Sequence, residues 1–268
     1  NRSEELCVRY GVEACNDSGY QEVTLSSLST SDYPQLTELC DDLEGFCQER
    51  HVNLSLPSLR ADNFSMSLMQ RLAKGRKSGL TFAPEAGTQR LRDVINKNVT
   101  QEELLASCRT AFAGGYSAVK LYFMLGLPTE TDEDVLGIAD LAARVMHAWR
   151  ESASNKQRGG RITVSTSWFV PKPHTAFQWE PQISKEEYQR RVKLLRKAIT
   201  TKTVTYNWHD PDTSFLEAVL ARGDRRMCKV LEAAWRKGAK LDAWEEYFSL
   251  ERWMEAFDEC GLDPHFYA

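Results

Sequence analysis

Polar side chains follow each of the short apolar segments of this sequence, and they are the residues best able to do chemistry. In chain order they are Ser26, Ser27 and Ser29; Ser58 and Arg60; Glu85; Gly126 to Glu130; Lys172 and His174; and His209 and Asp210. The set is rich in hydroxyl groups and poor in titratable groups. It therefore favours the binding of a polar small molecule over hydrolysis, which needs a base beside a nucleophile or a metal ion.

A metal ion is the alternative ligand for the charged members of this set. Carboxylate and imidazole groups are suitable ligands for zinc and similar ions. The four candidates are Glu85, His174, His209 and Asp210. They share no local spacing of the kind that short metal-binding loops show, so a metal site is the weaker hypothesis.

The same charged residues also have purely structural interpretations. Glu85 is suited to cap the helix that follows it. Lys172 and His174 lie beside prolines and are suited to the rim of a loop. Asp210 precedes Pro211, which is the arrangement of a helix N-cap with proline at the first helical position. Spacing alone does not choose between these roles and binding.

The stretch 115–134 explains how such residues are positioned. Its apolar run at 118–125, bounded by glycines, predicts a strand that is covered on both faces, as in parallel sheets. Gly126-Leu-Pro-Thr-Glu cannot continue that strand and predicts a tight loop. Thr131 and Asp134 have the spacing of a capping box, so a helix begins there. This is one strand–loop–helix unit, with its loop where ligands bind in α/β folds.

Similar units repeat along the chain. The other expected strands are 22–28, 52–56, 79–83, 161–170 and 203–208, and the other expected helices are 3–15, 36–50, 66–75, 88–95, 100–113 and 184–200. Strands that alternate with helices form a parallel sheet. About six strands favour an α/β fold of the partial TIM-like (β/α)6 barrel kind. We expect this barrel over 1–208 and a C-terminal helical extension over 209–268, whose aromatic residues pack on the barrel.

Composition excludes several classes of function. A net charge of −4 gives no basic surface for bulk binding to nucleic acid or membrane. No apolar run approaches the roughly 18 residues of a spanning helix, and no signal peptide opens the chain. No G-x-G-x-x-G follows a strand, which argues against a dinucleotide-binding fold.

The seven cysteines indicate the compartment. They are Cys7, Cys15, Cys40, Cys47, Cys108, Cys228 and Cys260. An odd, scattered set predicts a reducing, cytoplasmic environment. None lies at C-x-x-C or C-x-x-x-C-x-x-C spacing. Cys40 and Cys47 share one helix face and are expected to be buried core thiols.

Two motifs in order give the chain a family resemblance. The segment 82–100, FAPEAGTQRLRDVINKNVT, resembles the fourth strand–helix unit of radical S-adenosylmethionine (SAM) enzymes, in particular of the methylthiotransferases, and 123–134 is similar to the fifth. The second and sixth strands have counterparts in 23–33 and 164–173. Together with 171–180 and 208–226, the chain resembles an uncharacterised radical SAM group whose members often carry an upstream cobalamin-binding-like domain, so cobalamin is a candidate cofactor.

The resemblance implies a [4Fe–4S] cluster and SAM as cofactors. In the family the cluster is held by C-x-x-x-C-x-x-C after the first strand, and this sequence lacks that motif. Because the chain starts about where the first helix would, we expect that the first strand and the cluster loop were cut off upstream of Asn1. The barrel would then lack its first strand, and the fragment alone would be inactive.

The resemblance also implies contacts to SAM at the strand ends. Ser27 and Ser29 correspond to contacts with its amino group. The third and fourth strand ends correspond to contacts with ribose and carboxylate, and the fifth and sixth to contacts with adenine. The residues that correspond to the ribose and carboxylate contacts are Ser55, Ser58, Arg60 and Glu85. The residues that correspond to the adenine contacts are Leu125, Gly126, Phe169 and Val170. Glu85 and Ala86 stand where relatives have Gln and Ser.

The expected function is that of a radical SAM enzyme. It would cleave SAM to a 5′-deoxyadenosyl radical with electrons from a flavodoxin- or ferredoxin-like donor. The substrate, RNA or protein by analogy, would contact Lys172, His174 and His209. One alternative is a cluster-free α/β hydrolase in which His174, His209 and Asp210 hold a metal ion. The other is a non-catalytic module whose aromatic C-terminal helices bind a partner chain.

Overall fold

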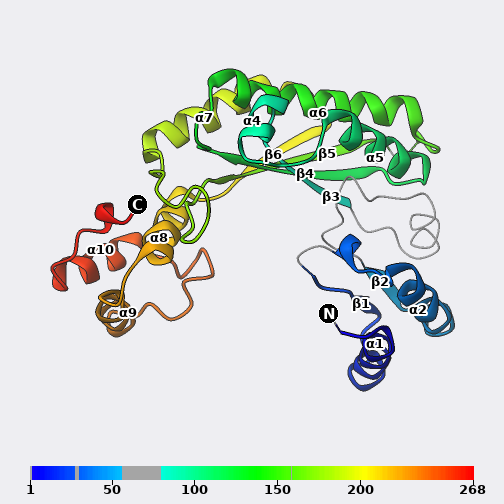
Figure 1. Ribbon diagram of the computed structural model, residues 1–268, viewed down its shortest axis with the longest axis horizontal. Helices are drawn as coiled ribbons and strands as arrows, with labels where there is room; N and C mark the ends of the chain where they lie inside the picture. Colours follow the sequence, from blue (N-terminus) through cyan, green and yellow to red (C-terminus); the bar gives the residue numbers. More distant parts are fainter. Residues whose placement is uncertain (1, 28–29, 56–79, 158) are drawn as a thin grey trace. The chain divides into compact units, whose positions relative to one another are not determined.

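The computed structural model describes residues 2–27, 30–55, 80–157 and 159–268 (Figure 1). The chain divides into two compact units. The first comprises Asn1–Phe123, Leu136–Ser165 and Ala198–Asn207, and the second comprises Met124–Val135, Thr166–Lys197 and Trp208–Ala268. The predicted boundary at residue 208 stays a prediction.

The first unit begins with two helices and two short strands. They are α1 (Glu4–Ser18), β1 (Glu22–Thr24), the 3-10 turn η1 (Thr30–Asp32), α2 (Leu36–Arg50) and β2 (Asn53–Ser55). β1 pairs with β2 in parallel, with Val23 opposite Leu54. The helices pack through a small core that includes Leu39, Leu43 and Cys47. Cys40 and Cys47 are buried free thiols, as predicted.

The next elements of the first unit follow the predicted caps. β3 (Leu80–Glu85) leads into α4 (Gln89–Val94) and α5 (Gln101–Ala113). The Thr100–Glu103 capping box is present, because each side chain bonds to the backbone N–H of the other residue. The predicted helix at 66–75 lies outside the described residues.

A four-stranded sheet has the order β3-β4-β5-β6, with β4 at Ala118–Leu125, β5 at Arg161–Trp168 and β6 at Val204–Trp208. β3 and β4 are parallel, with Phe82 opposite Leu121. Burial alternates along β4: the face with Val119 and Leu121 is buried, whereas Lys120 and Tyr122 are only partly buried. The helices α4, α5 and α6 (Asp132–Ser152) lie along one face of this sheet (Figure 1). The expectation of cover on both faces of β4 is therefore confirmed for the face with Val119 and Leu121, and the other face is partly covered in the described chain.

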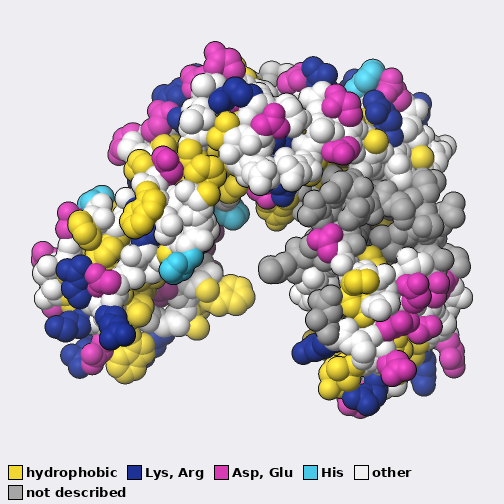
Figure 2. Space-filling view, viewed as in Figure 1, with side chains coloured by type: hydrophobic (Ala, Val, Ile, Leu, Met, Phe, Trp, Pro, Cys, Tyr) yellow, Lys and Arg dark blue, Asp and Glu magenta, His cyan; other side chains and the backbone are white. Residues whose placement is uncertain are grey.

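The second unit contains α7 (Lys185–Ala198, apart from its last residue) and the C-terminal helices α8 (Pro211–Arg222), α9 (Met227–Arg236), α10 (Leu250–Glu259) and the 3-10 turn η2 (Pro264–Phe266). Trp253 and Phe257 are buried in the core that these C-terminal helices share. Trp235, Trp244 and Tyr247 are exposed, and the packing of aromatic residues of this extension on the barrel stays a prediction. Figure 2 shows hydrophobic side chains at the surface of this part of the chain.

The fold class is confirmed as α/β with parallel strand pairs. Among the residues that the structure describes, the strands form two separate sheets, β1-β2 and β3-β4-β5-β6. Closure into a barrel and the absence of a first strand stay predictions. None of the described helices is long and apolar enough to span a membrane.

Candidate functional site

The last residue of β3, Glu85, has an unusual backbone conformation. Its φ is 66°, in the left-handed region that non-glycine residues seldom occupy. The β3–β4 register shifts between Phe82 and Glu85, so the strand ends on an irregularity. The cap of α4 is Thr88, whose hydroxyl accepts a hydrogen bond from the Leu91 N–H at 3.3 Å. The interpretation of Glu85 as the helix cap is therefore wrong.

The Glu85 carboxylate remains available to a ligand. Its side chain is 27% exposed, and Lys97 Nζ lies 3.4 Å from its Oε1. Burial raises the pKa of Glu85, and the Lys97 ammonium opposes that shift only in part. The Glu85 carboxylate has one amine as its partner, so it can accept further hydrogen bonds. Hydroxyl or ammonium groups of a ligand are suitable donors.

Two contacts hold this loop in place. Arg92 is buried, with 1% of its surface exposed, and its Nη1 donates to the Ala86 carbonyl at 2.9 Å. Gly137 of α6 allows a close approach, since a Cβ there would lie 2.8 Å from Thr88 Cγ2 and 3.2 Å from the Gly87 backbone. Neither contact was predicted from the sequence, although Gly137, a glycine within an otherwise regular helix, is a signal of close packing.

The loop after β4 is closed by a buried carboxylate. Glu130, whose side chain is 1% exposed, accepts a hydrogen bond from the Gly126 N–H at 2.7 Å and another from Arg191. Arg191 also donates to Glu187 at 2.7 Å. Burial raises the pKa of Glu130, against the lowering effect of the Gly126 N–H and Arg191. Because its Oε2 accepts from both the Gly126 N–H and Arg191, Glu130 has a structural role in closing this loop.

The predicted adenine-binding residues of the second unit do lie together. The Phe169 N–H donates to the Leu125 carbonyl at 2.8 Å, which brings Val170 next to the end of β4. Leu125 and Phe169 are buried, and Val170 is partly exposed. Gly126 has a φ of 89°, and a Cβ there would lie 2.9 Å from Ile183. The side chain of Ile183 therefore packs against Gly126. This contact joins residues far apart in the chain and was not predicted.

The three predicted substrate contacts also belong to the second unit. Lys172 forms an ion pair with Glu217. His174 is exposed, with a φ of 62°. His209 is exposed, its N–H donates to the Thr166 carbonyl at 3.0 Å, and its own carbonyl accepts from Tyr188 Oη at 3.1 Å. These contacts leave the His209 imidazole itself without an assigned role.

The hypothesis of a metal site gains no support from the geometry. Asp210 is the N-cap of α8, as its structural interpretation predicted, since its carboxylate accepts from the Thr213 N–H at 2.9 Å. Within the described ranges, no three His, Cys, Asp or Glu side chains gather in a way that could hold a metal ion. All seven cysteines are free thiols, and burial raises the pKa of Cys108 to about 12.

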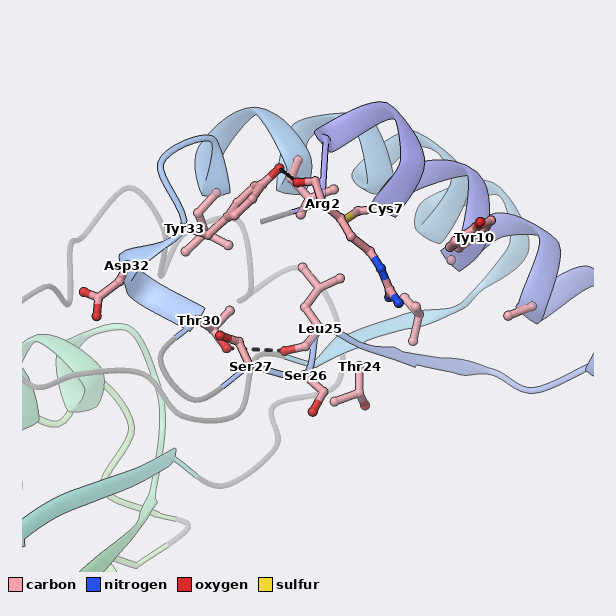
Figure 3. A pocket seen from close by; sticks show the side chains of 15 residues that line it. Arg2, Cys7, Tyr10, Thr24, Leu25, Ser26, Ser27, Thr30, Asp32 and Tyr33 are labelled. Carbon is pink, nitrogen blue, oxygen red and sulfur yellow. Dashed lines mark hydrogen bonds between the residues drawn. The ribbon is translucent and has the colours of Figure 1, made fainter. Parts of the chain in front are cut away.

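A pocket of about 750 Å³ lies beside the end of β1, where Ser27 is found (Figure 3). Helix α1 contributes Tyr10 and Cys7 to its lining, and Thr30 of η1 donates to the Leu25 carbonyl at 3.3 Å. Ser27 lines this pocket, as its predicted role requires. Ser29, Ser58 and Arg60 lie outside the described residues.

Comparison with known proteins identifies the family of this chain. The model of the Radical SAM superfamily matches residues 1–142, which include Ser27, Glu85 and the loop after β4. The chain is also 30% identical over 242 residues to the uncharacterized protein MJ0966 of Methanocaldococcus jannaschii, an alignment that covers 90% of this chain. It spans 50% of that relative, about half its length. Because the family model matches more than half of the sequence, this chain belongs to the radical SAM superfamily.

Proposed function

We propose that this chain is the SAM-binding part of a radical SAM enzyme, with Glu85 as a cofactor-binding residue. SAM carries ribose hydroxyls, an ammonium group and a carboxylate on an apolar nucleoside. Glu85 is suited to accept hydrogen bonds from the ribose hydroxyls, and Lys97 beside it supplies a cation. The left-handed backbone of Glu85 supports this role, because strain of this kind gathers at ligand sites.

We also propose the other predicted contacts to SAM and to the substrate. Ser27 at the pocket beside β1 is suited to the amino group of SAM. Leu125, Gly126 and Val170 are suited to adenine through their apolar surface, provided that Ile183 moves away from Gly126. Lys172, His174 and His209 are proposed substrate contacts, and RNA or protein is the proposed class of substrate.

The residues of this sequence do not fit an iron–sulfur cluster. The seven cysteines lack the cluster spacing, and in the described parts of the chain no group of potential metal ligands gathers. We therefore propose that the cluster ligands belong to a part of the full-length protein outside this sequence. Cobalamin and a flavodoxin- or ferredoxin-like electron donor are proposed for the full-length protein only.

The test is SAM binding and cleavage by the full-length protein with its cluster reconstituted. Wild type is expected to bind SAM in a calorimetric titration and to release 5′-deoxyadenosine on reduction. Glu85→Ala should weaken SAM binding about tenfold, because the acceptor for the ribose hydroxyls is lost. Glu102→Ala on α5 is the matched control and should bind as wild type does. A reconstituted wild-type protein that neither binds nor cleaves SAM would refute the proposal.

A further inference from the structure

The face of the sheet opposite its buried side chains is polar in the first unit. On β4, Lys120 and Tyr122 are partly buried between the buried positions Val119 and Leu121. Thr81 of β3 is opposite Lys120 in the parallel register, so their side chains share a face. An amine, a phenol and a hydroxyl therefore lie on this face.

Lys120 and Tyr122 form a pair on this polar face. They are two residues apart on one strand and point the same way. Lys120 Nζ lies 2.6 Å from Tyr122 Oη and 4.4 Å from the centre of the Tyr122 ring. The ammonium therefore donates to the phenol oxygen and is held beside the ring, which fixes a flexible side chain in one position.

The pair offers mainly hydrogen-bond donors to an incoming group. Its one remaining acceptor is the second lone pair of the phenol oxygen. An ammonium has three N–H donors, of which the phenol oxygen uses one, and the phenol O–H is a further donor. Across the ranges that the structure describes, no carboxylate pairs with Lys120. A partly buried cation without a counterion favours a negatively charged ligand over a neutral one.

We propose that Lys120 and Tyr122 bind an oxyanion, a carboxylate or phosphate group, of the enzyme's substrate. The β3–β4 register places Glu85 opposite Phe123, the residue after Tyr122. The oxyanion site therefore lies on the strand next to the one that ends at Glu85, although Phe123 and Tyr122 point to opposite faces of β4. That the ligand is the substrate rests on the proposed function, whereas the anion site itself does not.

The experiment is calorimetric titration of the full-length protein at low ionic strength with three probes. Pyrophosphate represents a phosphate ligand, citrate represents a carboxylate ligand, and SAM reports the cofactor site. Wild type is expected to bind pyrophosphate or citrate. Lys120→Met should weaken that binding about tenfold to hundredfold, and Tyr122→Phe should weaken it severalfold because the ring stays while the O–H is lost.

Lys202→Met is the control, because Lys202 is an exposed lysine before β6 in the same unit, and it should bind as wild type does. Circular dichroism of each variant checks that it is folded. If Lys120→Met binds the anions as tightly as wild type, or wild type binds neither, the proposal is wrong.

The SAM titration separates this inference from the proposed function. If Lys120→Met loses anion binding and keeps SAM binding, a separate oxyanion site is supported. If SAM binding falls in parallel, Lys120 serves the SAM carboxylate and the assignment to substrate is overturned. If wild type binds the anions through Lys120 but never binds SAM, the proposed function fails while the anion site stands.

Discussion

A glutamate follows a proline both at the end of β3 and in the loop after β4. The two carboxylates differ in their burial and in their hydrogen-bond partners. Glu130 is 1% exposed and accepts hydrogen bonds from the Gly126 N–H and from Arg191. Glu85 is 27% exposed and has Lys97 at 3.4 Å as its ion-pair partner. The first carboxylate closes its own loop, and the second is left open to other donors.

This difference shows why residue type alone does not identify a ligand-binding carboxylate. A buried carboxylate is stable only when its acceptors are occupied by donors of the protein. Glu130 has two such donors, both at its Oε2. At Glu85 the loop has a left-handed, non-glycine conformation and a desolvated carboxylate, features that stabilise nothing by themselves and that are frequent at functional sites.

The largest expected effect is on the closed loop. Glu130→Ala removes the buried partner of both Gly126 and Arg191, and we expect the free energy of unfolding to fall by about 3–5 kcal/mol. Asp132→Ala is the control, because Asp132 also pairs with an arginine, Arg190, but on an exposed surface. Its loss should be much smaller. Urea unfolding measures both, and equal losses would show that burial of Glu130 is not what stabilises the loop.

Gly126→Ala tests the same loop through its backbone. The substitution combines a φ of 89° with a Cβ 2.9 Å from Ile183, so we expect a loss of about 2–4 kcal/mol. Gly238→Ala is the control, since Gly238 has a φ of 100° with no atom near its Cβ position and isolates the cost of the backbone. A loss at Gly126 no larger than at Gly238 would contradict the close contact with Ile183.

Gly137→Ala tests how firmly the open loop is held. The new Cβ would press on Thr88 and Gly87, and we expect a loss of about 1–3 kcal/mol together with weaker SAM binding. Gly45→Ala in α2 has no atom within 4 Å of the new Cβ, so it should raise stability by about 0.5–1 kcal/mol. Thermal unfolding of both variants should therefore give shifts of opposite sign.

Glu85→Gln should have the smallest effect on stability and a pH-dependent one. Because the pKa of Glu85 is raised in the folded protein, the protonated carboxyl favours folding below the unfolded value of 4.5, and that contribution is lost as the pH rises through the raised pKa. Wild type should therefore lose stability relative to Glu85→Gln as the pH rises above about 4.5. Urea unfolding at several pH values measures the difference, and a shift in the opposite direction would refute the burial of this carboxylate.

Local structure was predictable because its interactions join residues that are close in sequence. The Thr131–Asp134 box and the Asp210 cap were confirmed. These features depend on side chains bonding to backbone groups within about four residues. The helices and strands of the described chain follow from them and from hydrophobic periodicity.

The sequence by itself determined the strand–helix order, the helix caps and the family resemblance, all of which are written in short segments. Tertiary structure alone decided which carboxylate is occupied and which is open: Glu130 and Arg191 are 61 residues apart, and Glu85 and Lys97 are 12 apart. For Lys120 the two kinds of information combine: its position beside Tyr122 follows from the strand, because the two are two residues apart, whereas tertiary packing decides that no carboxylate pairs with it in the described chain. The reason is physical: the charge state and availability of a side chain depend on which groups packing brings around it, and packing joins residues far apart in the chain.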